Sequence, residues 1–347
     1  MKIAMISFTG NGRRLERSLA HELEKEGHQV LQAVKCKELE SDKDAVKCSA
    51  REWTGEQFRT RDVLIFIGAV QIAVRLIASF IGSKTTDPAV LVLDEKGQYC
   101  IPILSGHIGG ANEMAERIAE MAGALPVITT ATDIRGKWAI DVFARKNHLY
   151  IEDMQKAKQI SAKILEGKTV VAAIESGRYS IEGTVPEEVK IVPETYENPD
   201  IYIGIYERKL SSHVLRLIPQ RITVGIGCRR GTSAEQIEQL VDKILKESHI
   251  NKKSIGRIAS IDLKKDEKGL LTFCNKYNIE PEFYPAEELK KVEGEFSVST
   301  FVKKVTGVDN VCERSAVYTG GTLRIRKQAE NGVTAAFAWD NWRVKFE

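Results

Sequence analysis

The sequence lacks the features that mark several common classes of protein. Lysine and arginine total 51 against 48 aspartate and glutamate residues, so the formal net charge is only +3. A surface for nucleic acid usually needs a larger positive excess. Cysteine is scarce, and the six residues form no C-x-x-C pair and no Cys/His spacing typical of structural zinc. These absences predict free thiols, no structural zinc and no nucleic-acid partner.

Long apolar segments are also missing. The longest, residues 63–70, is less than half the length of a membrane span. The apolar stretch at residues 3–8 is too short for a signal peptide, and Arg13 and Arg14 follow it rather than precede it. We therefore expect a soluble cytoplasmic protein with no membrane partner. Its 347 residues are enough for roughly two or three domains.

Strands and helices alternate along most of the chain. Residues 2–8 form a short apolar pattern, and Leu15, Leu19 and Leu23 then recur at helical spacing. Further strands are predicted at 63–67, 90–93, 99–104, 126–129, 169–174, 201–206, 214–218, 222–226, 257–261, 323–326 and 333–338, with helices near 111–122, 154–165, 237–245, 267–277, 286–292 and 310–318. Such alternation predicts an α/β protein. We expect two α/β domains with mainly parallel sheets, at 1–145 and 220–347, joined by a small middle α+β domain at 146–219.

The most unusual segment is Leu104 to Glu113, which places Ser105, three glycines and His107 between a strand and a helix. Such junctions bind anions through free N–H groups and the positive end of the helix dipole. The alternative is a tight turn with His107 as a helix cap. His107 is the best general-base candidate among the six histidines, because no other has a glycine-rich frame.

The segment Thr129 to Asp133 follows the next predicted strand, so it should lie at the same sheet edge as the first loop. Its hydroxyls and carboxylate could bind polar substituents. A Ser/Thr or Asx turn that caps the next element explains the pattern equally well.

A second glycine-rich turn, Gly225 to Thr232, contains Arg229 and Arg230. Thr232 or Ser233 with Glu235 or Gln236 is typical of a capping box at the following helix. Two arginines beside free N–H groups can clamp a carboxylate or phosphate. This turn lacks the Gly-Lys-Ser/Thr of a P-loop, and the turn Gly10-Asn11-Gly12 after the first strand lacks the third glycine of a dinucleotide fingerprint. Nucleotide binding is therefore disfavoured. For Cys228, an inert, partly buried thiol is favoured over one with a lowered pKa.

Two charged segments, Lys264 to Glu267 and Cys312 to Ser315, follow later strands. A charged run is more often a solvated face than a site. Their position after strand ends keeps both as candidates.

Taken together, these motifs resemble a known family. Asp87-Pro88-Ala89-Val90, the Ser-Gly-His-x-Gly-Gly-Ala-Asn core and Thr129 to Asp133 resemble the cobalt-precorrin-5A hydrolase family of anaerobic cobalamin biosynthesis. The Gly225 to Thr232 turn and the two charged segments look like that family's C-terminal domain, which also resembles a free-standing protein of the aerobic route. Gln71 and Arg135 depart from the family pattern.

The resemblance implies a hydrolase that acts on a carbon-carbon bond. It would open the δ-lactone of cobalt-precorrin-5A and release C20 with its methyl group as acetaldehyde, which gives cobalt-precorrin-5B. Cobalt would enter within the substrate, so no cofactor is held by the protein. Neighbouring pathway enzymes and a second copy of the chain are further candidate partners. We expect His107 to activate water, the N–H groups of Gly109 to Ala111 to hold the oxyanion, and Glu113 or Asp133 to orient the histidine.

The remaining candidates are assigned to substrate binding: Ser105, Gly106, Gly109, Gly110, Asn112, Thr129, Thr130, Thr132, Gly227, Arg229, Arg230, Lys264, Glu267 and Glu313. Paired arginines at strand-to-helix turns suit the acetate and propionate carboxylates of a tetrapyrrole. The alternative function is a non-catalytic protein of the same pathway that binds a tetrapyrrole and hands it over.

Overall fold

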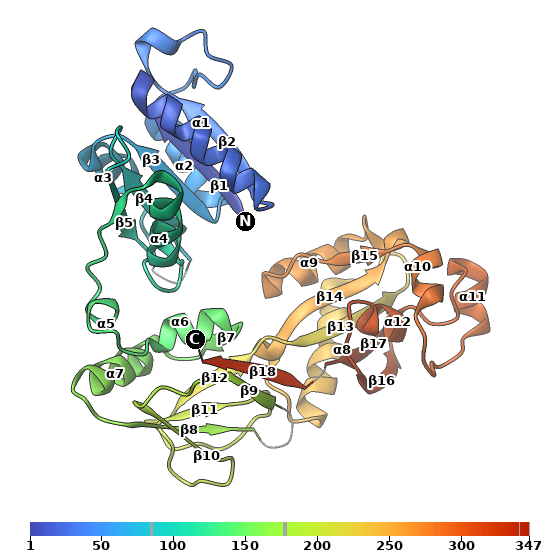
Figure 1. Ribbon diagram of the computed structural model, residues 1–347. Coiled ribbons are helices and arrows are strands. Elements are labelled where there is room, and N and C mark those ends of the chain that lie inside the picture. Colours follow the sequence, from blue (N-terminus) through green and yellow to red (C-terminus); the bar gives the residue numbers. More distant parts are fainter. Residues whose placement is uncertain (84–85, 176–178, 340, 347) are drawn as a thin grey trace. The chain divides into compact units, whose positions relative to one another are not determined.

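The computed structural model describes residues 1–83, 86–175, 179–339 and 341–346. The chain divides into two compact units, Met1–Val142 and Phe143–Glu347, whose elements are labelled in Figure 1. No helix among the described residues is long and apolar enough to cross a membrane. The sheets of both units are mostly parallel and packed with helices, which confirms the predicted α/β class. The three-domain division at residues 145 and 219 stays a prediction.

The first unit is built on one six-stranded sheet. Its strands are β1 (Lys2–Ser7), β2 (Gln29–Val34), β3 (Val63–Ile67), β4 (Ala89–Leu93), β5 (Tyr99–Leu104) and β6 (Leu125–Pro126), and its helices are α1 (Gly10–Lys25), η1 (Lys37–Leu39), α2 (Ala50–Thr60), α3 (Val70–Ile77), α4 (Ala111–Ala122), α5 (Ala131–Ile134) and the start of α6 (Ile140–Lys146). The strand order is β2-β1-β3-β4-β5-β6. All neighbouring pairs are parallel except β4 with β5.

Both faces of this sheet are covered, because side chains alternate along each strand. Ile3 and Met5 of β1 pack with Leu19 and Leu23 of α1 and with the apolar side of α4. The intervening side chains, such as Ile6, pack instead against α2 and α3. Almost the whole of β1, β3 and β4 is therefore buried, as expected for strands with helices on both sides.

The second unit contains two five-stranded sheets. Its first elements are β7 (Leu149–Ile151), α7 (Met154–Leu165), β8 (Val170–Ile174), β9 (Tyr179–Gly183), β10 (Val189–Pro193), β11 (Ile201–Ile203) and β12 (Leu215–Pro219). The first sheet has the order β10-β8-β11-β12-β7, and only β7 is antiparallel to its neighbour. Near the end of the chain, β18 (Trp342–Phe346) pairs in parallel with β9.

The second sheet of this unit follows Pro219. Its elements are β13 (Ile222–Cys228), α8 (Ala234–Glu247), η2 (Lys252–Ser254), β14 (Ile255–Ile261), η3 (Asp262–Lys264), α9 (Lys268–Tyr277), β15 (Glu282–Tyr284), α10 (Ala286–Lys291), α11 (Thr300–Thr306), α12 (Cys312–Val317), β16 (Leu323–Glu330) and β17 (Val333–Ala338). The order is β15-β14-β13-β17-β16, with β13 to β15 parallel and the β16–β17 hairpin antiparallel.

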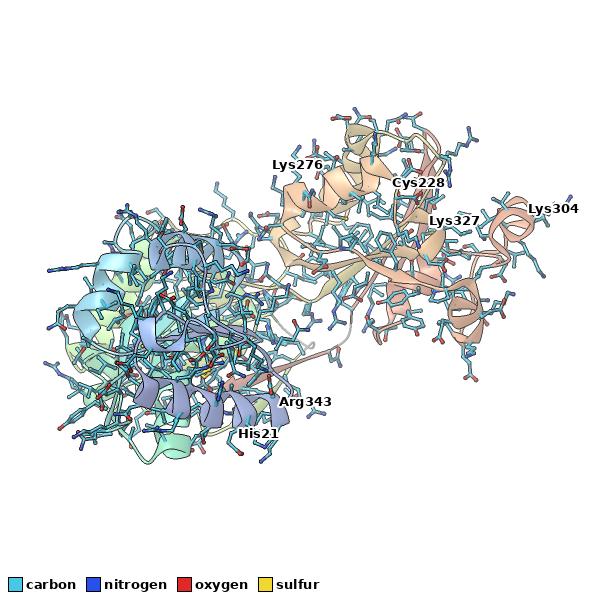
Figure 2. All side chains as sticks on the ribbon, turned by 90° about the horizontal axis from the view of Figure 1, so that it is seen from above. His21, Cys228, Lys276, Lys304, Lys327 and Arg343 are labelled. Atoms are coloured by element: carbon cyan, nitrogen blue, oxygen red, sulfur yellow. The ribbon has the colours of Figure 1, made fainter. Side chains whose placement is uncertain are left out.

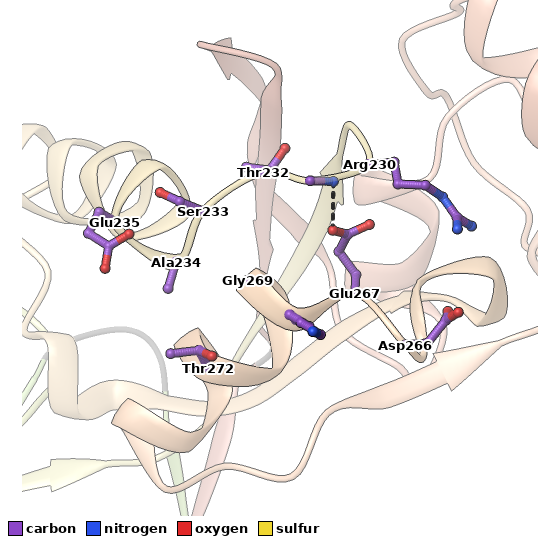
Figure 3. Close-up of a pocket in the computed structure, with 11 residues that line it drawn as sticks. Arg230, Thr232, Ser233, Ala234, Glu235, Asp266, Glu267, Gly269 and Thr272 are labelled. Atoms are coloured by element: carbon purple, nitrogen blue, oxygen red, sulfur yellow. Dashed lines mark hydrogen bonds between the residues drawn. The ribbon is translucent and has the colours of Figure 1, made fainter.

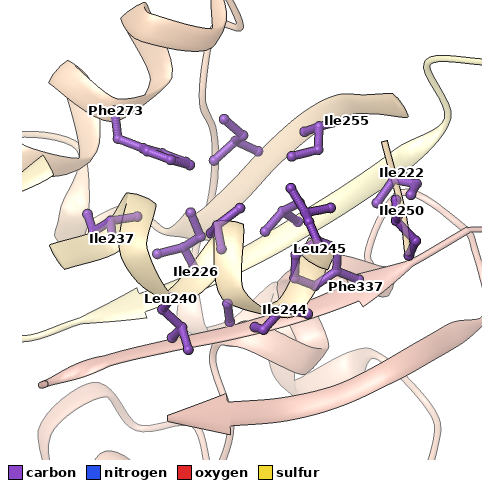
Figure 4. Packing of buried hydrophobic residues seen from close by; sticks show 14 of the residues in the cluster. Ile222, Ile226, Ile237, Leu240, Ile244, Leu245, Ile250, Ile255, Phe273 and Phe337 are labelled. Carbon is purple, nitrogen blue, oxygen red and sulfur yellow. The ribbon is translucent and has the colours of Figure 1, made fainter. Parts of the chain in front are cut away.

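Each face of this sheet has its own core. Ile237, Leu240 and Ile244 of α8 pack with Ile226 of β13 and Phe273 of α9 (Figure 4). On the other face, α12 and α10 cover the sheet with smaller apolar side chains. Charged side chains such as Lys276 and Lys304 extend from the outer surfaces of the helices (Figure 2).

Three predicted elements are clearly shorter in the structure. The strand expected at 201–206 ends at Ile203. The strand expected at 126–129 ends at Pro126, because β6 pairs only with Tyr99 and Cys100. The helix expected at 310–318 begins at Cys312, because the Asn310 side chain accepts a hydrogen bond from the Glu313 N–H (2.9 Å) and stays outside the helix.

The sequence patterns also missed several short elements. These are the strands β2, β7, β9, β10, β15 and β18 and the helices α2, α3, α5, α6 and α11.

Candidate active site

The loop between β5 and α4 is folded tightly on itself. The Ala111 N–H donates to the Ser105 carbonyl (3.1 Å) and the Gly110 N–H to the His107 carbonyl (3.0 Å). Ser105 has a left-handed φ of 56°, and a Cβ on Gly109 would lie 2.4 Å from the Ser105 Cβ. The glycine is therefore required for loop closure. Of the three N–H groups expected to hold the oxyanion, Gly109 to Ala111, those of Gly110 and Ala111 are therefore used within the loop.

Asn112 joins this loop to the segment Thr129 to Asp133. Its Nδ2 donates to Thr130 Oγ1 (2.8 Å) and to Asp133 Oδ2 (2.7 Å). A Cβ on Gly106 would lie 2.7 Å from Asn112 Oδ1, so Gly106 gives the amide its space. The expectation that the two loops meet at one sheet edge is confirmed. Asn112 acts here as a bridge between the loops.

The two threonines beside Asp133 differ in their surroundings. Thr132 is buried, and its Oγ1 lies 3.3 Å from His107 Nε2. Thr129 is exposed and makes no side-chain hydrogen bond within the described residues. Thr132 therefore belongs to the surroundings of the histidine, whereas Thr129 faces solvent.

His107 lies between two carboxylates. Its Nε2 is 2.8 Å from Asp133 Oδ2, and its Nδ1 is 3.1 Å from Asp141 Oδ1. The pKa of His107 is raised to about 9, and the hydrogen bond to Asp141 is the largest cause. Burial opposes this shift, whereas the charges of both carboxylates reinforce it. A pKa of this size favours the imidazolium at neutral pH. A protonated ring has no lone pair to accept a proton from water, so this arrangement favours a proton donor over the predicted general base at His107.

Asp141 was missed by the sequence patterns. It stands in the first turn of α6, a helix that they did not predict. Burial disfavours its charged form, but the hydrogen bond and charge of His107 outweigh burial and lower its pKa. Asp141 takes the orienting role expected for Glu113, which lies exposed on α4. An acidic residue at a helix start 34 positions from the histidine gives no sequence signal of its own.

The second glycine-rich turn is also closed by its own chain. The Gly231 N–H donates to Glu267 Oε1 (2.8 Å), as Figure 3 shows, and Lys264 Nζ lies 3.4 Å from Glu267 Oε2. Ser233 and Gln236 form the predicted capping box of α8. Glu267 is 9% exposed, and its hydrogen bond holds the turn to the start of α9.

Two pockets flank this turn and differ in charge. The one in Figure 3 measures about 550 Å³ and is lined by the carboxylates Glu235, Asp266 and Glu267 besides Arg230. The other measures about 660 Å³ and is lined by Gly227, Arg229, Arg230 and Lys264 among others. These four residues, which the sequence analysis assigned to substrate binding, therefore share the second pocket.

Glu313 differs from expectation, whereas Cys228 agrees with it. Glu313 is fully buried and accepts hydrogen bonds from the Ser297 N–H (2.6 Å), Asn310 Nδ2 (2.7 Å) and the Lys327 N–H (2.7 Å). It anchors backbone and is not placed to bind substrate. Burial raises the pKa of the Cys228 thiol, although the charge of Lys264 opposes the shift. This agrees with an inert thiol.

Three family models match successive parts of the chain. They are described as Cobalamin synthesis G N-terminal (residues 52–133), Cobalamin biosynthesis central region (138–219) and Cobalamin synthesis G C-terminus (222–338). A cobalt-precorrin-5A hydrolase from Priestia megaterium is 34% identical over 82% of this chain and 79% of its own length. The chain belongs to the cobalt-precorrin-5A hydrolase family. Another member, from Salmonella typhimurium, is 35% identical over 80% of this chain and 82% of its own length.

A solved structure from Sulfolobus solfataricus, described as a cobalamin biosynthesis protein G homolog, covers 97% of both chains at 23% identity, with a TM-score of 0.44. Within this member of the hydrolase family, His107 and Asp133 lie in the segment matched by the N-terminal model, whereas Asp141 lies in the segment matched by the central model. The carboxylate–histidine–carboxylate group thus draws on two family-model segments.

Proposed function

We propose that this chain hydrolyses cobalt-precorrin-5A, opening its δ-lactone and releasing C20 with its methyl group as acetaldehyde to give cobalt-precorrin-5B. The names of its relatives supply the substrate and the reaction class. The observation that carries the proposal is the His107 imidazolium held between Asp133 and Asp141, because hydrolysis of a lactone needs both a proton acceptor and a proton donor.

In this proposal Asp133 is the acceptor. Its Oδ2 receives hydrogen bonds from His107 and Asn112, and its side chain is 33% exposed, so water can reach the carboxylate. Asp133 takes a proton from the water that attacks the lactone carbonyl carbon, and the new C–O bond forms. The bond between that carbon and the lactone oxygen then breaks.

His107 is the proposed donor. Its imidazolium gives a proton to the oxygen that leaves the acyl carbon, so the C20 hydroxyl is formed. Asp133 returns the proton to His107 across their 2.8 Å hydrogen bond. Asp141 holds the ring through Nδ1 and stabilises its charged form.

The second step breaks a carbon-carbon bond. The C20 hydroxyl loses its proton to a carboxylate of this group, the bond from C20 to the macrocycle breaks, and the electron pair passes to the macrocycle. The macrocycle then takes up the proton from that carboxylate, which restores the site. Acetaldehyde leaves with both carbons, and one water is consumed overall. Cobalt takes part as a component of the substrate, and we propose no metal held by the protein.

The direct experiment is anaerobic incubation of the purified chain with cobalt-precorrin-5A, with acetaldehyde measured by an alcohol dehydrogenase assay. We expect one acetaldehyde per substrate consumed, and multiple turnovers per protein. Binding of the tetrapyrrole without aldehyde would contradict catalysis and favour the alternative, a carrier that hands the tetrapyrrole on.

A further inference from the structure

The larger of the two pockets beside the second glycine-rich turn lies where parallel strands end. Cys228 ends β13, and Leu263 and Lys264 follow β14 directly. The end of β16 and the start of β17 complete the same edge, because Val333 pairs with Cys228. Ligands of open α/β sheets usually bind outside the carboxyl ends of the strands. The pocket of about 660 Å³ therefore occupies the ligand-binding edge of this sheet.

Cations without acidic partners surround this pocket. Among the described residues, Arg229, Arg230 and Lys327 have no carboxylate within ion-pair distance, although each lines the pocket. Glu330, the carboxylate that also lines it, pairs with Lys243 (2.7 Å). The backbone of Lys327 is held in place, because its N–H donates a hydrogen bond to the buried Glu313 carboxylate. Unpaired cations held around a concavity are a site for carboxylates or phosphates.

Another part of the pocket wall is apolar and exposed to solvent. Leu263 is 51% exposed and Val305, on α11, is 63% exposed. Val302 of the same helix continues this wall. Large apolar side chains at the mouth of a pocket mark a binding surface when they lie together. A phosphate or another small hydrophilic anion would leave this wall uncovered, so the ligand needs an extended apolar part as well as carboxylates.

We propose that this pocket binds one carboxylate-bearing edge of an acidic tetrapyrrole, with Arg229 and Lys327 on the carboxylates and Leu263, Val302 and Val305 against the ring. The pocket is smaller than a whole tetrapyrrole, so the rest of the macrocycle extends beyond it. The identity of the ligand rests on the proposed function. The site itself lies entirely within the second unit, whereas His107 lies in the first.

The test uses the full-length chain with His107→Asn, so that binding is measured without turnover. The probe is cobyrinic acid, a stable cobalt corrin with a rim of carboxylates, and its methyl ester serves as the uncharged counterpart. Titration is followed by tryptophan fluorescence and by calorimetry. We expect Arg229→Ala and Lys327→Ala each to weaken binding of the acid roughly tenfold, and the ester to bind weakly in all variants.

Two matched controls lie on the same surface. Lys304 is an exposed cation on α11 that does not line the pocket, and Figure 2 places it apart from Lys327. Lys304→Ala should therefore keep the affinity for the acid within about twofold. Val305→Asn should weaken binding roughly threefold, whereas Val298→Asn, at an exposed valine outside the pocket, should not.

Equal affinity in Arg229→Ala, Lys327→Ala and Lys304→Ala would overturn this site, whatever the catalytic result. If the unmodified chain releases no acetaldehyde from cobalt-precorrin-5A but binds the acid in a Lys327-dependent way, the proposed reaction is overturned and the proposed site is retained. Thermal melts of each variant check that the unit remains folded.

Discussion

The two glycine-rich strand-to-helix turns look alike in sequence but carry opposite charge. The loop after β5 leads into a histidine flanked by Asp133 and Asp141. The turn after β13 leads into two arginines without carboxylate partners among the described residues. In both turns some N–H groups expected to face a ligand are used within the chain, by Ser105 and His107 in the first and by Glu267 in the second.

The difference shows that glycine in such a turn specifies the path of the backbone, whereas side chains from distant segments specify the chemistry. Asp141 gives the first turn its proton-transfer character, and Lys327 gives the second pocket a further cation. We therefore assign the first turn to catalysis and the second to binding. The following experiments would break or sharpen that division.

The largest effect is expected from the carboxylate–histidine–carboxylate group. His107→Asn removes the proton donor and should lower kcat for acetaldehyde release by about 10²- to 10⁴-fold, with corrinoid affinity nearly unchanged. Glu113→Gln is the matched control, because the sequence analysis named Glu113, beside Asp133, as a candidate to orient the histidine, but Glu113 lies exposed on α4. A loss in Glu113→Gln as large as that in Asp141→Asn would restore Glu113 to the site, and native kcat in Asp141→Asn would remove Asp141 from it.

A second comparison concerns the glycines themselves. A Cβ on Gly225 would lie 1.9 Å from the Cys312 carbonyl oxygen and 2.7 Å from the Ala316 nitrogen, so Gly225→Ala forces α12 away from β13. We expect a loss of about 1–3 kcal/mol or more in the free energy of unfolding, measured by urea denaturation.

The matched variant at the first turn is Gly109→Ala. Its Cβ would meet Ser105 in the loop itself, so it should lower kcat with a smaller loss of stability. Gly225→Ala with native stability, or Gly109→Ala with native activity, would show that the turn concerned does not need its glycine.

The pH dependence distinguishes an acid from a base at His107. Since its pKa is raised to about 9, the donor form persists through neutral pH and is lost above it. We expect kcat to fall about tenfold per pH unit above 9. A general base with a pKa near 6.5 would instead give a rate that rises with pH through 6.5, and such a profile would contradict the donor role.

Stability should follow the same titration. The folded-state pKa of His107 lies above its unfolded value of about 6.5, so the interaction contributes fully below pH 6.5 while its partners are ionised. The contribution is lost as pH rises through about 9. Urea midpoints of the unmodified chain and of His107→Asn should therefore converge above pH 9; a constant difference would contradict the raised pKa.

The sequence predicted the fold class and the meeting of the two loops, because both depend on local patterns. Apolar runs such as residues 63–67 become buried strands, and segments after neighbouring strands share an edge. It failed where a role depends on packing. Glu313 belongs to a charged segment, as Lys264 does, but it is fully buried and its carboxylate accepts a hydrogen bond from the Lys327 N–H. Asp141 acts only because α6 begins beside His107.

The smallest effect is expected at the turn after β13, and it tests whether this turn serves binding alone. Arg229 is exposed beside the larger pocket, so Arg229→Ala removes one carboxylate contact that substrate and transition state share. Removal of such uniform binding raises KM without lowering kcat. We expect KM to rise about fivefold at low salt, with kcat within twofold. The rise should shrink as salt increases, because exposed charges are screened.

Steady-state acetaldehyde assays of Arg229→Ala measure this split, with Lys265→Ala as the control. Lys265 is an exposed cation beside Lys264 that lines neither pocket next to the turn. A variant with normal KM and a strongly lowered kcat would place Arg229 in contact with charge that develops during the reaction. The two turns would then share the chemistry, and the assignment of catalysis to the first turn alone would be wrong.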